Sequence, residues 1–187
     1  MKNLLTFILI FCIAILYAQE QKVVIKTSLG IIEVVLYPDK APVTVRNFLQ
    51  YVDKGAYTNS SFFRVCNPEN EANREVKIEV IQGGNVSKEN ILPPIALETT
   101  EKTGILHKDG VISMARSGPD SATSSFFICI NDQPELDFNG KRNLDGKGFA
   151  AFGMVTVGMD IVKKIQAMAS TDQYLITPVA IESITRL

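Results

Sequence analysis

Arg64 is the residue whose type fits its surroundings least. It stands in the stretch SFFRVC at 61–66, where an arginine is costly unless it is paired or lies at a groove. Eighteen residues later, Gln82 ends a second apolar stretch just before two glycines. On their own, Arg64 is typical of a surface charge at a strand edge, and Gln82 of an amide bonded to the glycine turn. The alternative is a fixed guanidinium beside an amide in one groove, where both can donate hydrogen bonds to a bound group.

The chain offers little for metal or nucleophilic chemistry. It has one histidine, no tryptophan and three cysteines, without a CxxC pair or any spacing typical of metal ligands. His107 precedes a turn at 109–110 and is interpreted as a loop residue. Cys129, within FFICI at 126–130, is predicted to be a buried thiol, and a Cys66–Cys129 disulfide is the alternative. We therefore expect no metal site and no cofactor.

Charge and length limit the function classes. Lys and Arg number 19 against 20 Asp and Glu, for a formal net charge of −1, which gives no electrostatic argument for binding nucleic acid or an anionic membrane. A chain of 187 residues is a one-domain length, and we find no linker or repeat within it. We expect a monomer.

The first residues are typical of an export signal. Lys2 is followed by an apolar run at 4–17, shorter than the roughly 20 residues of a spanning helix, and the chain turns polar after Ala18. We predict a signal peptide at 1–18 and an exported protein, periplasmic or secreted, of bacterial type. The alternative is an uncleaved N-terminal membrane anchor.

The remainder alternates short strands with two helices. Runs of β-branched residues predict a hairpin over 23–37 and strands at 61–66, 78–82, 111–115, 126–130, 150–156 and 179–186. A helix follows Ala41, with Asp39 as its predicted cap, and ends near Gly55. A second helix is predicted over 159–168. Two helices among about eight strands, without βαβ alternation, favour an antiparallel barrel or sandwich with helical covers.

Several segments, in order, resemble the cyclophilin family of peptidyl-prolyl cis-trans isomerases. They are SFFRV at 61–65, VIQGG at 80–84, GVISMARSGP at 110–119, SSFFI at 124–128, LD at 136–137 and GFAAFG at 148–153. We assign residues 22–187 to one domain of this type. The resemblance implies an eight-stranded antiparallel β-barrel with two covering α-helices and a catalytic groove on its outer face.

The resemblance also implies roles for ten residues. Arg64 is the expected catalytic arginine, and Gln82 the glutamine that positions it and binds substrate backbone. The expected substrate-binding residues are Phe127, Leu136, Phe149 and Val80 around the prolyl ring, Ala115, Arg116 and Ser117 along the substrate backbone, and Phe62.

The groove also departs from the family pattern. Phe149 stands where many cyclophilins have histidine, and Glu79 falls near a usual phenylalanine, which leaves that side of the pocket open to question. Cyclosporin-sensitive members carry tryptophan just before the leucine that matches Leu136, and here Glu135 occupies that place. The segment 67–77 lengthens the connection between Arg64 and Gln82 beyond that of short family members.

Two functions fit these residues. The first is a peptidyl-prolyl cis-trans isomerase that accelerates X–Pro isomerisation in exported proteins, with Pro-containing unfolded or extended polypeptides as partners. The second is a Pro-peptide-binding chaperone or scaffold module with little turnover. Retained Arg64, Gln82 and Phe127 favour the enzyme, and altered Glu79 and Phe149 keep the binding module as the alternative.

Overall fold

The computed structural model describes residues 21–187. The predicted signal peptide at 1–18 lies outside the described residues. Within 21–187, no helix has the length and apolar character needed to cross a membrane.

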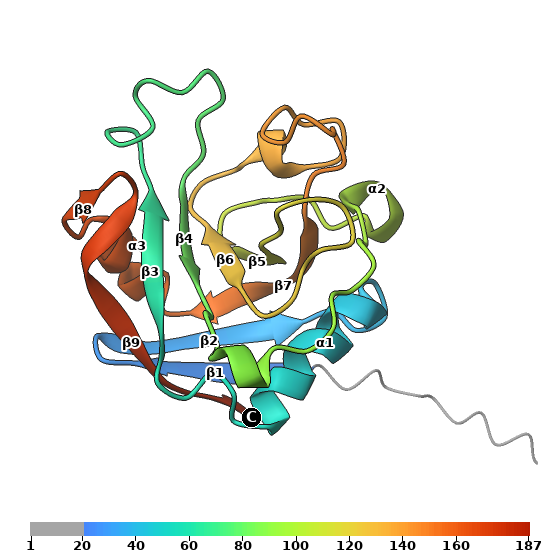
Figure 1. Ribbon diagram of the computed structural model, residues 1–187, viewed down its shortest axis with the longest axis vertical. Helices are drawn as coiled ribbons and strands as arrows, with labels where there is room; N and C mark the ends of the chain where they lie inside the picture. The colour runs from blue at the N-terminus through green and yellow to red at the C-terminus, as the bar shows by residue number, and fades with distance from the viewer. Residues whose placement is uncertain (1–20) are drawn as a thin grey trace, which may run out of the picture.

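Within residues 21–187, nine antiparallel strands form one sheet, and eight of them close into a barrel (Figure 1). The barrel order is β1-β2-β7-β5-β6-β4-β3-β9, and β9 pairs with β1 to complete the circle. The strands are β1 Gln21–Thr27, β2 Gly30–Leu36, β3 Ser60–Cys66, β4 Val80–Gly83, β5 Val111–Met114, β6 Phe126–Cys129, β7 Ala150–Val157, β8 Ser170–Thr171 and β9 Tyr174–Arg186. The predicted eight-stranded antiparallel barrel is confirmed.

The last strand is longer than predicted. The sequence indicates a strand only after Pro178, because proline donates no ladder hydrogen bond. In the structure β9 starts at Tyr174, pairs with the two-residue β8, and passes through Pro178 where its register with β3 is irregular. A bulge of this kind accommodates proline, since the residues there are not in regular pairing.

In the part of the chain that the structure describes, three α-helices and two short 3-10 turns accompany the barrel. They are α1 Pro42–Asp53, α2 Thr100–Thr103, α3 Met159–Gln166, η1 Lys88–Asn90 and η2 Pro134–Leu136. The two long helices are those predicted, whereas the one-turn α2 was not. Helix α1 buries Val45, Phe48 and Val52 against the barrel, which is the face that their i, i+3, i+7 spacing predicts.

The cap of α1 is not the predicted one. Asp39 is exposed and lies before the N-cap residue Ala41. Instead the Glu98 carboxylate accepts hydrogen bonds from the backbone N–H groups of Val43 (3.1 Å) and Thr44 (2.8 Å) and from the Thr44 hydroxyl (2.7 Å). A carboxylate at a helix N-terminus satisfies free donors and complements the helix dipole, so a residue 54 positions away performs the capping.

The barrel interior is filled rather than hollow. Aromatic rings of Phe48, Tyr57, Phe62, Phe126 and Phe152 pack there with centroid separations of 5.2–5.8 Å. A second, smaller apolar cluster lies apart from this core and consists of Cys66, Ile78, Val80, Phe127, Cys129 and Leu136. Because strand residues alternate between faces, the second cluster marks the outer face of β3, β4 and β6.

Candidate active site

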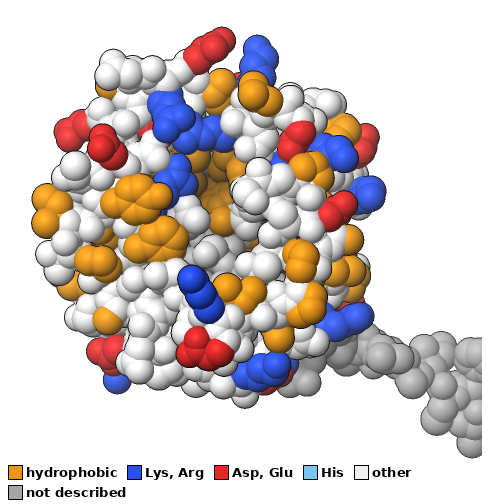
Figure 2. Space-filling model, viewed as in Figure 1, with side chains coloured by type: hydrophobic (Ala, Val, Ile, Leu, Met, Phe, Trp, Pro, Cys, Tyr) orange, Lys and Arg blue, Asp and Glu red, His pale blue; other side chains and the backbone are white. Residues whose placement is uncertain are grey.

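A pocket of about 240 Å³ opens over the second cluster. Figure 2 shows a hollow on this face whose floor is apolar and whose border carries cationic side chains. It is lined by Arg64, Ile78, Val80, Gln82, Ala115, Arg116, Phe127, Leu136, Arg142, Asn143 and Phe149. Eight of the ten residues expected from the sequence therefore meet in one pocket.

Strand register brings the central residues together. Gln82 of β4 lies between Arg64 of β3 and Phe127 of β6, since it pairs with both. Phe126 points into the barrel and is fully buried, while Phe127 belongs to the outer cluster. Phe126 thus faces the barrel interior and Phe127 the outer face, which is the assignment expected from the family pattern.

Phe62 does not lie in the pocket, and its predicted substrate contact is wrong. It is fully buried in the barrel interior, with its ring 5.8 Å from that of Phe126. Two residues on one strand normally share a face, but a register shift lies between Phe62 and Arg64. The bulge changes the alternation, so Arg64 faces outward while Phe62 faces inward.

Ser117 also lies outside the pocket lining. It is exposed, and its backbone N–H and hydroxyl both meet the Ser121 hydroxyl, at 3.1 and 3.2 Å. Ala115 and Arg116, just before it, do line the pocket. Ser117 therefore belongs to the turn that follows the pocket-lining segment.

The guanidinium of Arg64 is held by two neutral amides. Its Nη1 donates to Gln82 Oε1 at 2.7 Å, while Nε and Nη2 donate to Gln173 Oε1 at 3.0 and 2.6 Å. An arginine has five N–H donors, and two of them have no partner within residues 21–187. The arrangement fixes the plane of the cation and keeps donors for a bound group.

The pocket floor is aromatic. The rings of Phe127 and Phe149 meet edge to face with centroids 5.2 Å apart, and Leu136 is fully buried beside them. Edge-to-face packing is a preferred aromatic geometry. The floor therefore presents a packed apolar slot that can hold a small ring.

His107 lies in the loop before the turn at 109–110, as predicted, and its side chain is buried. Its Nδ1 lies 2.7 Å from Asp137 Oδ1, its Nε2 lies 2.9 Å from Ser113 Oγ, and its ring stacks on Phe127 at 5.9 Å. In a neutral imidazole, Nδ1 donates to the carboxylate and Nε2 accepts from the hydroxyl. The connectivity is that of a hydrolase triad, but Ser113 is fully buried and its hydroxyl is not accessible to a substrate. The three residues support the pocket floor.

Arg116 closes one side of the pocket. Its guanidinium lies 5.2 Å over the Phe149 ring, donates to Gly148 O at 2.7 Å, and forms two bonds of 2.7 and 2.8 Å to the Asp145 carboxylate. The hydrogen bond from Arg116, joined by one from the Lys147 backbone, lowers the pKa of Asp145 to about 2. The charge of Arg116 is therefore compensated at neutral pH.

Three pocket residues were not among those expected from the sequence. The first is Ile78, which lines the pocket because residues 78 and 80 share a face. Glu79 points away from the pocket and accepts a hydrogen bond from Asn131 at 3.1 Å. Because strand residues two apart share a face, the sequence could have identified Ile78 from the position of Val80. Arg142 and Asn143 come from a loop without periodicity, and no local signal identifies them.

The two cysteines of the domain are free and buried. Val80 pairs with Cys66 on one side and with Cys129 on the other, so the cysteines are two strands, about 10 Å, apart. A disulfide needs Cα atoms within about 7 Å, and the alternative of a Cys66–Cys129 bridge is therefore wrong. Burial raises the pKa of Cys66 to about 11 and that of Cys129 well above its usual range, so both are inert thiols at neutral pH.

Comparisons with known proteins agree on one family. The model of the cyclophilin type peptidyl-prolyl cis-trans isomerase family matches residues 22–186. Peptidyl-prolyl cis-trans isomerase B of Escherichia coli is 37% identical over 149 residues, covering 77% of this chain and 83% of that protein. A peptidyl-prolyl cis-trans isomerase of Acinetobacter baylyi is 39% identical over 145 residues, which cover 75% of this chain and 69% of that protein.

Solved structures show the same fold. A crystal structure of a Cryptosporidium parvum cyclophilin type isomerase matches with a TM-score of 0.71 at 21% identity, over 90% of this chain and 98% of that one. A second structure of that protein, determined in the presence of the dipeptide Ala-Pro, matches with a TM-score of 0.69. With its barrel, its pocket and these relatives, the chain belongs to the cyclophilin family and is a peptidyl-prolyl cis-trans isomerase.

Proposed function

We propose that the pocket over β3, β4 and β6 binds Pro-containing extended polypeptide segments and that Arg64 catalyses rotation of the X–Pro bond. The observation that carries the proposal is the arginine held by Gln82 and Gln173 beside the Phe127 slot. A cation fixed by neutral groups keeps its positive potential, which a carboxylate partner would cancel.

The chemistry requires no covalent step. Amide resonance opposes rotation with a barrier of about 18–20 kcal/mol, and a catalyst must favour the twisted amide over both planar forms. In the twisted state the prolyl nitrogen regains a lone pair, to which one of the remaining Arg64 N–H groups can donate. The donor is preorganised, so it does not reorganise as the bond rotates.

Substrate binding uses the rest of the pocket. Phe127, Leu136 and Phe149 supply an apolar slot for the prolyl ring, and the backbone at Ala115 and Arg116 follows strand β5, where an extended peptide can pair. The crystal structure determined in the presence of Ala-Pro, a dipeptide that ends in proline, supports this class of ligand. No metal is involved in this scheme, and residues 21–187 contain no cluster of three or more metal-ligating side chains.

A protease-coupled assay on Ala–X–Pro–Phe peptides with varied X tests the proposal. We expect the cis fraction to convert at a rate proportional to the concentration of protein, with variation of X showing the preference for the residue before proline. Peptide binding detected by calorimetry with no increase in the isomerisation rate would instead support a binding module without turnover.

We also propose that the clients are exported proteins and that the chain acts outside the cytoplasm. The support is the sequence of residues 1–18, with its short charged start, apolar run and polar break. Intact-mass analysis of fractions from the producing cell should find a form that starts near Gln19 outside the cytoplasm. Recovery of the full chain from Met1 in the membrane fraction would support an uncleaved anchor. The monomeric state stays a prediction, which light scattering can check.

A further inference from the structure

The segment 67–77 carries a buried carboxylate into the neighbourhood of the pocket. It forms the long loop between β3 and β4 (Figure 1), and its Asn67 and Asn70 fold it through side-chain bonds to nearby backbone groups. Glu71, in the middle of this segment, has no exposed surface. Burying an ionised carboxylate is unfavourable unless it is fully paired, so its partners identify its role.

Glu71 has partners on two distant parts of the chain. Arg142, which lines the pocket, donates to it through Nη1 at 2.5 Å and Nη2 at 3.2 Å. The amide nitrogen Nε2 of Gln173, in the turn between β8 and β9, donates to Oε1 of the same carboxylate. Arg74 approaches it at 3.8 Å, with a side chain that is largely exposed.

Gln173 links this carboxylate to the arginine of the active site. While its Nε2 bonds Glu71, its Oε1 accepts from both Nε and Nη2 of Arg64. Its backbone oxygen accepts from Val65 N at 2.8 Å, which fixes the turn against β3 next to Arg64. The side-chain amide of Gln173 is therefore hydrogen-bonded to the buried Glu71 carboxylate at one end and to the Arg64 guanidinium at the other.

The backbone of Gln173 supplies an independent observation. Its φ is +74°, in the left-handed region that glycine adopts freely and other residues rarely do. The preceding Asp172 also has a positive φ, of 47°, as expected for a two-residue hairpin turn in which glycine is favoured at the second position. A buried glutamine at that position is strained, and strain held at one residue points to a function of its side chain.

We propose that Glu71 and Gln173 are positioning residues for Arg64, with Glu71 orienting the Gln173 amide and that amide holding the guanidinium. The inference rests on the catalytic role of Arg64 proposed above. The carboxylate fixes which end of the amide faces Arg64, because only the NH₂ end can donate to it and the oxygen is then left for the guanidinium. The segment 67–77 thus supports the active site through Glu71, although the pocket itself is lined by residues that adjoin or contact the segment, such as Ile78 and Arg142.

The test exploits the strained turn. Gln173→Gly removes the positioning side chain and relieves the positive φ, which offsets part of the cost of the hydrogen bonds lost to Glu71 and Arg64, so the variant should stay folded. We expect kcat to fall by about tenfold and KM to change by less than twofold, since the apolar slot is untouched. Gln173→Asn, which tolerates a positive φ but is one carbon shorter, should behave like the glycine variant.

A spectroscopic measurement separates positioning from a structural role. The ¹⁵N–¹H signal of Arg64 Nε should be sharp and protected from exchange in the wild-type protein, and broadened or rapidly exchanging in Gln173→Gly. Arg74→Ala is the matched control, because it removes another cation near Glu71 without touching Gln173. It should keep kcat/KM within twofold and leave the Nε signal unchanged.

Glu71 is tested through its coupling to Gln173. Glu71→Gln keeps the shape of the side chain and should also lower kcat. The double variant Glu71→Gln/Gln173→Gly should lose no more kcat than Gln173→Gly alone, because both changes act on the same contact. Additive losses, or wild-type kcat with an unchanged Arg64 signal in Gln173→Gly, would overturn the inference. If Arg64→Ala is itself fully active, the catalytic role fails instead; if Arg64→Ala is impaired and Gln173→Gly is not, only the positioning inference fails.

Discussion

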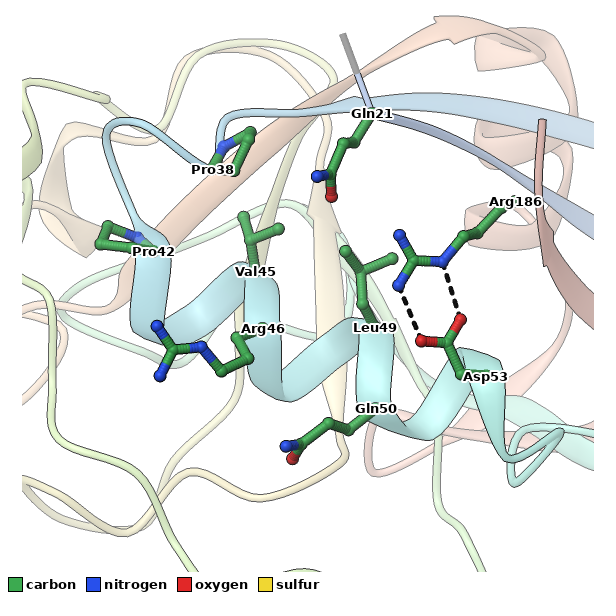
Figure 3. A pocket seen from close by; sticks show the side chains of 9 residues that line it. All are labelled: Gln21, Pro38, Pro42, Val45, Arg46, Leu49, Gln50, Asp53 and Arg186. Atoms are coloured by element: carbon green, nitrogen blue, oxygen red, sulfur yellow. Dashed lines mark hydrogen bonds and ion pairs between the residues drawn. The ribbon is translucent and has the colours of Figure 1, made fainter. Parts of the chain in front are cut away.

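Two pockets of this barrel hold arginines with different partners, and the proposed active site is the smaller of the two. The pocket beside α1 has a volume of about 320 Å³, against about 240 Å³ for the pocket over the outer cluster (Figure 3). In the larger pocket Arg186 forms two bonds of 2.7 Å to the Asp53 carboxylate, and both side chains are about half exposed. In the smaller pocket Arg64 is bonded by two amides. The chemistry of the partner, not the volume, distinguishes the two sites.

The difference in partners has a physical consequence. A bidentate carboxylate binds two of the five Arg186 donors and cancels the charge of the guanidinium, and water screens what remains. Gln82 and Gln173 orient Arg64 without neutralising it, and the nearest compensating charge, Glu71, lies one residue further away. A preorganised cation with remaining donors can stabilise a transition state, whereas a surface ion pair contributes at most a little to stability.

The largest expected effect comes from removing one arginine or the other. Arg64→Ala should lower kcat/KM by about 100-fold, within the range that loss of one preorganised donor costs. Arg186→Ala should leave kcat/KM within twofold. Both are measured with the protease-coupled peptide assay, and circular dichroism should show both variants folded. Full activity of a folded Arg64→Ala protein would remove the basis of the comparison.

Binding of cyclosporin probes the rim of the smaller pocket. Glu135 stands where the resemblance places tryptophan in sensitive cyclophilins, and aromatic anchors of this kind often carry about 2 kcal/mol or more of binding. We expect inhibition at least tenfold weaker than in those members, while peptides still turn over, because the floor of Phe127, Leu136 and Phe149 is intact. Glu135→Trp should recover part of the affinity.

Tight inhibition of the unaltered protein would contradict this prediction. It would mean that Glu135 does not stand where sensitive cyclophilins have tryptophan. In the structure the Glu135 carboxylate accepts a hydrogen bond from the backbone N–H of Lys141 at 2.8 Å. The peptide assay on the same sample serves as the control, since it reports the floor of the pocket independently of the rim.

The sequence predicts the barrel and most of the pocket for identifiable reasons. Runs of β-branched residues locate the strands, and alternation separates Phe126 from Phe127 once the family pattern gives the face. Phe62 was assigned to the wrong face because a bulge is not visible as a break in hydrophobicity. The beginning of β9 was missed because Pro178 is normally incompatible with a paired strand.

Long-range polar contacts could not be predicted. Glu98 caps a helix 54 residues away, Glu71 pairs with Arg142 across 71 residues, and Gln173 reaches Arg64 across 109. None of these has a local signal, because a polar residue that bonds a distant partner resembles a solvated one in the sequence. The proposed catalytic pair, Arg64 and Gln82, follows only from the family pattern, and the residues that hold Arg64 from the other side follow only from the structure.

The salt bridge at the rim of the smaller pocket should contribute more to stability than the one in the larger pocket. Arg116 is only 2% exposed and pairs with Asp145, so Asp145→Asn leaves a buried guanidinium without its countercharge. We expect a loss of about 1–2 kcal/mol in the free energy of unfolding at pH 7. Because the folded pKa of Asp145, about 2, lies below its unfolded value near 3.9, the contribution is complete above about pH 4.5. It should be lost as the pH falls from about 4.5 through 2.

Urea unfolding of the wild type and of Asp145→Asn at several pH values measures that contribution. The two free energies should differ most between pH 5 and 7, approach each other near pH 2 and converge below it. A difference that stays constant through pH 2 would show that the lost contribution is packing rather than the charge of Asp145.

The smallest expected effect belongs to the Asp53–Arg186 pair of the larger pocket. Its hydrogen bonds lower the pKa of Asp53, so any stabilisation is present at neutral pH and is lost in acid, as for Asp145. Both side chains are about half in water, however, and exposed pairs contribute only about 0.2–1 kcal/mol. Asp53→Asn should therefore cost about 0.5 kcal/mol or less at low salt, and the difference should vanish in about 1 M salt, where charges are screened within about 3 Å. The Asp145→Asn difference, which involves the buried Arg116, should largely survive the same salt. Equal salt sensitivity of the two variants would show that burial of the arginine does not set the two pockets apart.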